Sequence, residues 1–282
     1  MKQIVIVLIS FLLGFTLHVS AQKDVTAKAD EAFKSGQYFA AIDLYKFAYG
    51  KAKDKELKAQ IIFNVANCYQ LTNDFRQAEI WFNKAIKKEY ANPLVYLYYG
   101  NALKKNQKYD EAIDQFAIYK ELVPDDPRAD EGITSSELAK EWIENPTRYE
   151  VTNMYYFNTK QSEYCPNFAK EDYTLVYFTS SRESSTGSKI NDVTGEFYTD
   201  IFQSRKDRKG KWSEPIPLDE NVNTEFDEGV SCLNEKNNTL YFTSFREDSE
   251  GKLGCQIYYS QKQGVTWGEP QVIPLTADSI TV

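Results

Sequence analysis

Residues 163–275 contain the same sequence pattern twice, and this repetition constrains the fold more than any single motif does. The matching segments are 175–182, 200–204 and 211–215 in the first copy, and 239–246, 256–260 and 266–270 in the second. Both copies keep their β-rich segments in the same order. Self-similarity of this length is typical of a repeat architecture, so repeated residues must first be considered as parts of the repeat.

Each copy offers four short strands. The first follows an acidic residue (Glu163 or Asp227), the second is Tyr-Phe-Thr-Ser, the third begins Ile-Phe or Ile-Tyr, and the fourth follows Glu-Pro. Four antiparallel strands per unit describe a β-propeller blade. The copies differ by eight residues between 183 and 200, which we interpret as a longer hairpin loop. Because a propeller needs about four to eight blades to close, we predict that residues 163–282 are two blades of an unfinished propeller in a longer protein.

Residues 22–126 have helical periodicity with small and aromatic residues at fixed places. The recurring residues are Gly36, Tyr38, Ala41, Tyr45 and Ala48, then Asn73, Phe75, Ala78, Phe82 and Ala85, then Gln107, Tyr109, Ala112, Phe116 and Tyr119. The alanines at 41, 78 and 112 are 37 and 34 residues apart. This matches the tetratricopeptide repeat (TPR) of about 34 residues, in which each repeat is a pair of antiparallel helices. We therefore predict three TPR repeats.

A seventh helix is predicted at 127–146, because Asp126-Pro127 has the form of an N-cap followed by proline in the first turn. Its apolar side chains would cover the end of the solenoid. They are Ile133, Leu138, Trp142 and Ile143. Residues 147–162 then form a linker and a strand that leads into the blades. The expected fold class is α+β multidomain, an all-α TPR solenoid followed by all-β propeller blades.

Residues 1–21 have the pattern of a secretory signal peptide, with Lys2, an apolar run from Ile4 to Leu17, and small residues before Ala21. A membrane anchor is the alternative, but the run is shorter than the roughly 20 residues that span a bilayer. Cleavage would leave an exported, periplasmic protein that does not span the membrane. It would also remove His18, the only histidine. We therefore expect no His-based nucleophile, no His-ligated metal, no cofactor and no enzyme activity.

The net charge of −8 argues against nucleic-acid binding, which needs a basic face to displace counterions from phosphates. The four cysteines favour buried free thiols over a disulfide, although one disulfide stays open as the alternative. Cys68 falls in a helical repeat, and Cys165, Cys232 and Cys255 fall on strands. On first and third strands of one blade, Cys232 and Cys255 would lie about 10 Å apart, too far for a bridge.

The blade motifs are Tyr-Phe-Thr-Ser-Ser-Arg at 177–182, Tyr-Phe-Thr-Ser-Phe-Arg at 241–246, Trp-Ser-Glu-Pro at 212–215 and Trp-Gly-Glu-Pro at 267–270. With the preceding signal and TPR repeats, the chain resembles periplasmic proteins of Bacteroidetes in which TPR repeats precede a TolB-like, WD-type propeller and an OmpA-like domain. The PorE-type component linked to type IX secretion and gliding belongs to this family. The resemblance covers essentially the whole mature chain.

The resemblance implies a position near the outer membrane and periplasmic or outer-membrane proteins as partners. It also implies peptidoglycan binding through the OmpA-like domain, but that domain is absent from this sequence, so no residue here is given a peptidoglycan contact. A second departure lies before the Tyr-Phe strands. The family's Asp-Gly turn is replaced by Glu171-Asp172 and Asn237-Asn238, which also suit a hairpin turn.

Residues repeated in both blades are expected to build the blade. This applies to Arg182, Arg246, Trp212 and Trp267, although a ligand-binding role for the arginines is the alternative. The carboxylate pairs Glu163 with Asp227 and Glu214 with Glu269 are repeat-equivalent too, and we do not expect them to be catalytic.

The TPR groove is the better candidate for recognition, because the first helix of each pair lines a concave surface. The expected partner-binding residues are Phe33, Lys34, Phe63, Asn67, Gln70, Asn101, Lys104 and Lys105, and the same face should include Asp30, Leu71 and Leu97. Asn67 and Asn101 share one repeat position, from which an amide can pair with the backbone of an extended peptide. Lys104 and Lys105 would meet a carboxylate. The alternative is a solvated face without a ligand.

These features favour a non-enzymatic periplasmic scaffold that binds proteins through its groove and its propeller surface, in a secretion or motility complex anchored to the cell wall. Two alternatives stay open. One is a glycan-binding accessory of carbohydrate uptake, which would need aromatic rings open to solvent on the propeller. The other is the regulatory propeller of a larger hydrolase.

Overall fold

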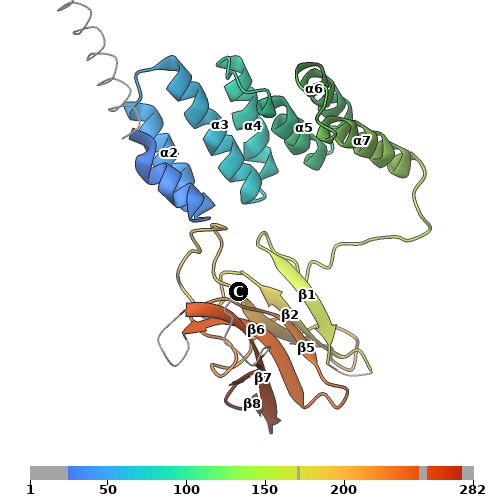
Figure 1. The fold of residues 1–282 in the computed structure, drawn as a ribbon. Helices are drawn as coiled ribbons and strands as arrows, with labels where there is room; N and C mark the ends of the chain where they lie inside the picture. The colour runs from blue at the N-terminus through green and yellow to red at the C-terminus, as the bar shows by residue number, and fades with distance from the viewer. Residues whose placement is uncertain (1–24, 170–171, 248–252, 275–282) are drawn as a thin grey trace, which may run out of the picture. The chain divides into compact units, whose positions relative to one another are not determined.

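A computed structural model describes residues 25–169, 172–247 and 253–274. The chain divides into two compact units (Figure 1), which are Met1–Glu150 with Asp192–Gly195, and Val151–Asn191 with Glu196–Val282. We call them the helical unit and the strand unit. The signal peptide predicted at 1–21 lies outside the described residues.

The helical unit is a row of antiparallel helix pairs with a TPR-like fold (Figure 1). Its elements are a helical stretch at 25–34, α2 (Tyr38–Lys51), α3 (Lys55–Leu71), α4 (Phe75–Lys87), α5 (Leu94–Lys105), α6 (Tyr109–Leu122) and α7 (Arg128–Glu144). Stretch 25–34 pairs with α2, α3 with α4, and α5 with α6. These are the helix pairs that the repeat spacing predicts.

The turn inside each pair depends on a residue with positive φ. Gly36, Asn73 and Gln107 have φ values of 77°, 61° and 63°, and they occupy the same position of the repeat. Only glycine adopts this left-handed conformation without a steric cost, and asparagine tolerates it better than most residues. The turn therefore recurs at the predicted spacing even where the residue is a glutamine.

The core between the helices is built from the residues that recur in the sequence. Ala41, Ala78 and Ala112 are fully buried. Phe116 lies between two glycines, since a Cβ added to Gly100 or Gly132 would lie 2.7 or 2.8 Å from its ring. Small residues thus allow the helices to approach closely, and an aromatic ring fills the space between them.

Helix α7 begins where the sequence predicts a helix, but it packs through other residues. The Asp126 carboxylate accepts a hydrogen bond from the Arg128 backbone N–H, as expected of a cap. The predicted apolar face is wrong in part. Leu138, Trp142 and Ile143 are 39%, 65% and 62% exposed, and only Ile133 is partly buried. The buried positions of α7 are Ala129, Gly132 and Ser136, because the Phe116 ring leaves room only for small side chains.

The strand unit contains two antiparallel sheets. The first sheet has the order β1 (Glu163–Phe168), β2 (Leu175–Ser180), β3 (Asp200–Arg205) and β4 (Ile216–Pro217). The second has the order β5 (Glu228–Leu233), β6 (Thr239–Glu247), β7 (Leu253–Gln263) and β8 (Thr266–Trp267), with β9 (Gln271–Val272) also paired to β7. The four segments predicted in each copy correspond to β1–β4 and to β5, β6, β7 and β9.

The two sheets also share a β-bulge in their first strands, and the position of the bulge corrects the predicted alignment of the two copies. Glu163 pairs with Ser180, and Glu228 pairs with Ser244, each followed by a bulge in the first strand. The carboxylate equivalent to Glu163 is therefore Glu228, and the predicted pairing with Asp227 is wrong by one residue. Asp227 instead accepts hydrogen bonds from the backbone and side chain of Thr199.

The two sheets stack face to face. Tyr177 and Ile201 of the first sheet share a core with Phe242 and Tyr258 of the second. The opposite face of the first sheet carries Phe178 and is covered by residues outside its strands, Phe157 and Trp212. The opposite face of the second sheet bears Tyr241 and Tyr259, which are only half-buried. The arrangement is that of two adjacent layers, and within the described residues it does not close into a ring.

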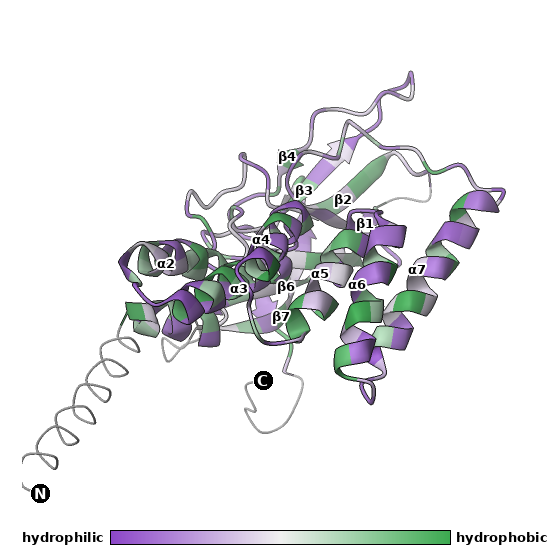
Figure 2. Ribbon diagram, turned by 90° about the horizontal axis from the view of Figure 1, so that it is seen from above, coloured by the Kyte–Doolittle hydropathy of each residue, from purple (hydrophilic) through white to green (hydrophobic). Residues whose placement is uncertain are grey.

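No described helix combines the length and the hydrophobicity needed to cross a membrane. Figure 2 shows polar and apolar residues alternating along the helices, as expected for helices with one packed face.

All four cysteines are free, but only Cys68 is buried. The prediction of buried thiols is therefore wrong for Cys232 and Cys255, which are exposed, and for Cys165, which is half-buried. These positions lie on strand faces that no other layer of the described residues covers.

Candidate functional site

Two open amides mark the face formed by the first helices of the repeats. Asn67 lies on α3 and Asn101 on α5, at the same repeat position, and both are half-exposed. Neither side chain forms a hydrogen bond with another residue in the described part of the chain. The amides therefore keep both a donor and an acceptor for a ligand or water. We call the surface around them the amide face.

The third residue at this repeat position, Asp30, is used inside the repeat instead. Its carboxylate accepts hydrogen bonds from the Thr26 hydroxyl (2.8 Å) and the Tyr45 hydroxyl (2.6 Å). Burial, followed by the hydrogen bond to Asp30, raises the pKa of Tyr45. The amide face consequently spans the second and third repeats, and the first repeat contributes structure.

Gln70 adds an acceptor to this face. It follows Asn67 by three residues on α3, and positions three apart lie on the same side of a helix. Its Oε1 atom is buried and has no hydrogen-bond partner among the described residues. A buried acceptor without a partner costs about 1–3 kcal/mol, so a donor from water or from a bound chain would stabilise it.

Lys104 occupies the position in α5 that Gln70 occupies in α3, but it already has a partner. Its Nζ donates a hydrogen bond to Ser135 Oγ at 2.8 Å and lies 5.7 Å from the centre of the Phe116 ring. Burial, and then the charge of Lys105, lowers the pKa of Lys104. The side chain joins α5 to α7, and a ligand carboxylate would have to compete with Ser135.

Other predicted groove residues do not belong to the amide face. Phe63 is 7% exposed and stacks on Tyr90 at 4.6 Å, and Leu97 is 2% exposed. Both are core residues, so the prediction that they display side chains to a partner is wrong. Lys105 lies over the ring of Phe75 and lines a separate hollow of about 650 Å³.

Three further predicted residues lie at the edge of the helical core. Phe33 is partly buried and packs edge-on against Tyr38, with ring centres 5.4 Å apart. Lys34 and Leu71 are exposed. Lys34 alone of the three has a side chain that can donate a hydrogen bond, and it forms none with another described residue.

The structure adds polar residues on α3 that sequence reasoning missed. Gln60 donates to Asn64 Oδ1 at 2.8 Å and accepts a hydrogen bond from the Tyr90 hydroxyl at 3.1 Å. Together with Asn67 and Gln70 they form a polar stripe along one helix. The spacing of four, three and three residues is the signal that could have identified them.

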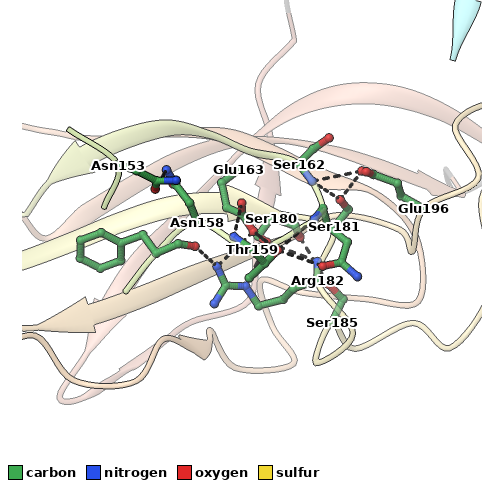
Figure 3. Close-up of polar contacts among 12 residues, drawn as sticks. Asn153, Asn158, Thr159, Ser162, Glu163, Ser180, Ser181, Arg182, Ser185 and Glu196 are labelled. Carbon is green, nitrogen blue, oxygen red and sulfur yellow. Dashed lines mark hydrogen bonds and ion pairs between the residues drawn. The ribbon is translucent and has the colours of Figure 1, made fainter. Parts of the chain in front are cut away.

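In the strand unit, Arg182 is the centre of a buried polar cluster (Figure 3). Its Nη2 donates to the Phe157 carbonyl at 2.7 Å and to Glu163 Oε1 at 3.3 Å, and its Nε donates to Ser180 Oγ at 3.0 Å. Glu163 also accepts hydrogen bonds from the backbone and hydroxyl of Thr159. The guanidinium therefore joins the segment before β1 to β1 and β2.

Arg246 forms the same cluster in the second copy. It donates to Ser244 Oγ at 2.7 Å and to the Val222 carbonyl at 2.6 Å, and it lies 3.7 Å from Glu228. Burial raises the pKa of Glu228, and burial lowers the pKa of Arg182. Two copies of one network, with donors directed at carbonyls and at a buried carboxylate, indicate a structural role for both arginines.

The two tryptophans are equivalent in their strand pairing, and each lies beneath a lysine. Trp212 bridges Lys206, whose Nζ lies 4.8 Å from the ring centre, and Trp267 pairs with Lys262, at 5.7 Å. Trp267 is buried between the sheets against Tyr177. Both rings pack within the strand unit and are not open to a ligand as flat platforms.

The described residues contain no group of three or more His, Cys, Asp or Glu side chains that could hold a metal ion. Glu214 and Glu269, which form the other predicted carboxylate pair, are exposed residues in the segments before β4 and β9.

A protein family defined by a domain of unknown function (DUF6340) matches residues 27–121, about a third of the chain. No curated protein sequence matches the chain. Among solved structures, the TPR domain of Arabidopsis OM64 is similar, with 25% identity, 43% of this chain and 97% of that chain covered, and a TM-score of 0.39.

The first TPR domain of human RPAP3 is also similar, with 25% identity, 45% of this chain and 97% of that chain covered, and a TM-score of 0.39. The Sgt2 TPR domain from Aspergillus fumigatus has 15% identity, coverage of 48% and 88%, and a TM-score of 0.40. The TPR-like assignment rests on the helix pairs, turns and core described above.

Proposed function

We propose that this protein is a non-enzymatic scaffold that binds an extended segment of a protein partner on the amide face of its helical unit. The observation that carries the proposal is the pair Asn67 and Asn101. Both amides occupy the same position of consecutive repeats, and both lack an intramolecular partner in the described residues. Side-chain amides in this state can pair with the N–H and C=O groups of a peptide backbone.

Gln70 supports the same proposal. A buried Oε1 without a partner is a cost in the free protein. Because this oxygen is buried, the Gln70 side chain would have to turn outward to accept a hydrogen bond from a peptide N–H, and that bond would remove the cost. The contribution of Lys104 is expected to be smaller, because its bond to Ser135 must first be broken.

The aromatic residues of the strand unit make glycan binding the weaker alternative. Stacking on a sugar needs a flat ring open to solvent. Phe168 and Tyr173 are exposed, but their planes are 89° apart and their centres 5.2 Å apart, so they meet edge to face. Tyr155 and Tyr156 are 82% and 60% exposed, but they lie in a turn before β1, outside both sheets. Tyr177, Phe178 and Trp267 are used in sheet packing.

We further propose that the protein acts after export, in the periplasm, within an outer-membrane-associated secretion or motility complex that is attached to the cell wall. The support is the signal-peptide pattern at 1–21 and the resemblance of the repeat motifs at 177–182 and 241–246. Under this proposal the strand unit contributes a second protein-binding surface, as part of a propeller.

The amide face can be tested by selecting extended peptides that bind the purified chain from a displayed library. The affinity of a selected peptide is then measured for the wild type, for Asn67→Ala with Asn101→Ala, and for the triple variant that adds Lys104→Glu. We expect the double variant to lose at least tenfold in affinity, since two polar contacts of about 1 kcal/mol each are removed. Unchanged affinity in the triple variant would contradict the proposal.

A matched control uses amides elsewhere in the helical unit. Asn83 and Gln115 lie on α4 and α6, the second helices of their repeats, away from the repeat position of the amide face. Alanine at both positions is expected to leave the affinity for the selected peptide within about twofold of the wild type.

A further inference from the structure

A hollow in the helical unit is lined by four lysines and two glutamates. It measures about 890 Å³ and lies between the first turns of α3 and the turn that follows α4. Lys55 and Lys58 come from α3, and Lys87 and Lys88 come from the end of α4. We call this hollow the lysine pocket. None of the groove residues predicted from the sequence lines it.

The lysines of the pocket are not neutralised by the protein. Within the described residues, none of the four forms an ion pair with a carboxylate. Some other lysines of the helical unit are paired, as in Lys108 with Glu79 at 2.7 Å and Lys120 with Asp130 at 2.6 Å. Four lysines against two glutamates, Glu56 and Glu89, give the lining a formal charge of +2 in a chain whose net charge is −8.

Tyr49 in the pocket lining lies beside two lysines, Lys58 of the lining and Lys84 outside it. Lys58 Nζ lies 5.3 Å and Lys84 Nζ 5.2 Å from the centre of the Tyr49 ring, and Lys84 lies 4.2 Å from that of Trp81. The rings attract each ammonium group, but the two cations repel each other across Tyr49. An anion placed beside them would reduce that repulsion.

The opposite wall is fixed by packing. The Tyr90 ring stacks on Phe63, and its hydroxyl donates a hydrogen bond to Gln60. Burial raises the pKa of Tyr90, so the hydroxyl stays protonated at neutral pH and cannot add negative charge. A packed aromatic ring beside lysine ammonium groups suits a ligand with both acidic groups and an apolar or backbone portion.

We propose that the lysine pocket binds an acidic segment of a protein partner. A volume near the upper end of ordinary ligand pockets accommodates several residues and exceeds what a single phosphate or carboxylate needs. The charged lining contains lysine but no arginine, which is the residue preferred for bidentate recognition of phosphate and nucleic acid. Glu56 and Glu89 belong to the same lining, and they would repel the acidic groups of the ligand toward the four lysines.

The pocket can be tested with a fluorescently labelled ten-residue peptide of Asp, Glu and Gly, and with a matched peptide of Asn, Gln and Gly. Anisotropy is measured with the full chain at low salt. We expect binding of the acidic peptide only, with affinity falling as salt is raised. Changing Lys55, Lys58, Lys87 and Lys88 to Gln should weaken that binding at least tenfold.

The matched control changes four exposed lysines of the strand unit to Gln and so alters the net charge equally. Those positions are Lys160, Lys209, Lys211 and Lys236. The control is expected to bind within about threefold of the wild type. Circular dichroism at 222 nm shows whether each variant keeps its helices.

Three results would overturn the proposal. They are no binding of the acidic peptide by the wild type, equal loss in the pocket and control variants, and binding of single-stranded RNA or anionic lipid vesicles in preference to the peptide. The test uses neither Asn67 nor Asn101, so its failure leaves the amide face untouched, and a failure of the amide face leaves the pocket untouched.

Discussion

Replacing Gly132 by alanine should destabilise the helical unit, although alanine is the better helix former. A Cβ at this position lies 2.8 Å from ring atoms of Phe116, well inside the 3.5–4.0 Å at which carbon atoms pack favourably. Alanine gains up to about 1 kcal/mol of helix propensity. Overpacking a filled core costs about 1–3 kcal/mol. The net expected effect is a loss of about 1 kcal/mol.

Gly50→Ala in α2 is the matched control, because a Cβ there meets no atom within 4 Å. This variant should be stabilised by about 0.5 kcal/mol, since it gains helix propensity near a helix end without a clash. Urea unfolding of the full chain, followed by the helical signal at 222 nm, gives the difference between the two variants. We expect it to be about 1–2 kcal/mol.

A double-mutant cycle tests the cause. Phe116→Leu alone opens space and is destabilising, but it removes the ring that meets the new Cβ. Gly132→Ala should therefore cost less in the Phe116→Leu background, with a favourable coupling of at least about 0.5 kcal/mol. If Gly132→Ala were as stable as Gly50→Ala, or if the coupling were absent, the account of how α7 packs on Phe116 would be refuted.

Three further predictions concern charge and reactivity. Burial raises the pKa of Asp200, so this group stabilises the fold fully below its ordinary pKa of 3.8 and loses that contribution as pH rises through its folded pKa. The free energy of unfolding of Asp200→Asn should therefore rise relative to that of the wild type as pH increases. A difference between the two proteins that stays constant from pH 4 to pH 8 would contradict this. Arg246→Met leaves Glu228 buried without its cation and should lower the free energy of unfolding by about 3 kcal/mol in urea titrations, whereas a loss under 1 kcal/mol would mean that the pair is not structural. Cys232 should react with Ellman's reagent in the folded protein. Burial raises the pKa of Cys68 to about 12, so this thiol should react only on unfolding. Fast reaction of Cys68 in the folded protein would contradict its buried placement.

The repeat pattern was sufficient to predict the helix pairs because the backbone of each repeat requires particular residue types at fixed positions. Ala41 and Ala78 are small residues buried between helices, and Gly36 and Asn73 are the turn residues with positive φ. Such residues are constrained by their own repeat, and their spacing is visible in the sequence. The four segments of each sheet were predictable for the same reason.

Residues that depend on a neighbouring element could not be predicted in this way. Phe63 has the repeat position of a displayed residue, but Tyr90 from the following turn stacks on it. Trp142 lies on the apolar stripe of α7, but Phe116 from α6 determines which side of α7 is buried. The position of a residue within its repeat can be read from the sequence. The exposure of its side chain depends on which residues of a neighbouring element pack against it.

The error at Asp227 has a local cause. The two copies are 64 residues apart in β2 and β6 but 65 apart in β1 and β5, because the loop before the second strand differs by one residue. Two acidic residues are adjacent at 227 and 228, so the alignment selected the first. The lysine pocket was missed because its lysines come from opposite ends of one repeat, the first turns of α3 and the end of α4, and only folding brings them together.

The central claim, that partners bind on the amide face, is tested most directly by site-specific photocrosslinking. A photoreactive amino acid is placed at position 67 or 101, and at the exposed positions 43 or 114 on the second helices of the repeats, in cells that produce the protein. The account predicts that one partner protein crosslinks from both 67 and 101 and from neither 43 nor 114. Crosslinking to the same partner from 43 and 114, with none from 67 and 101, would contradict it.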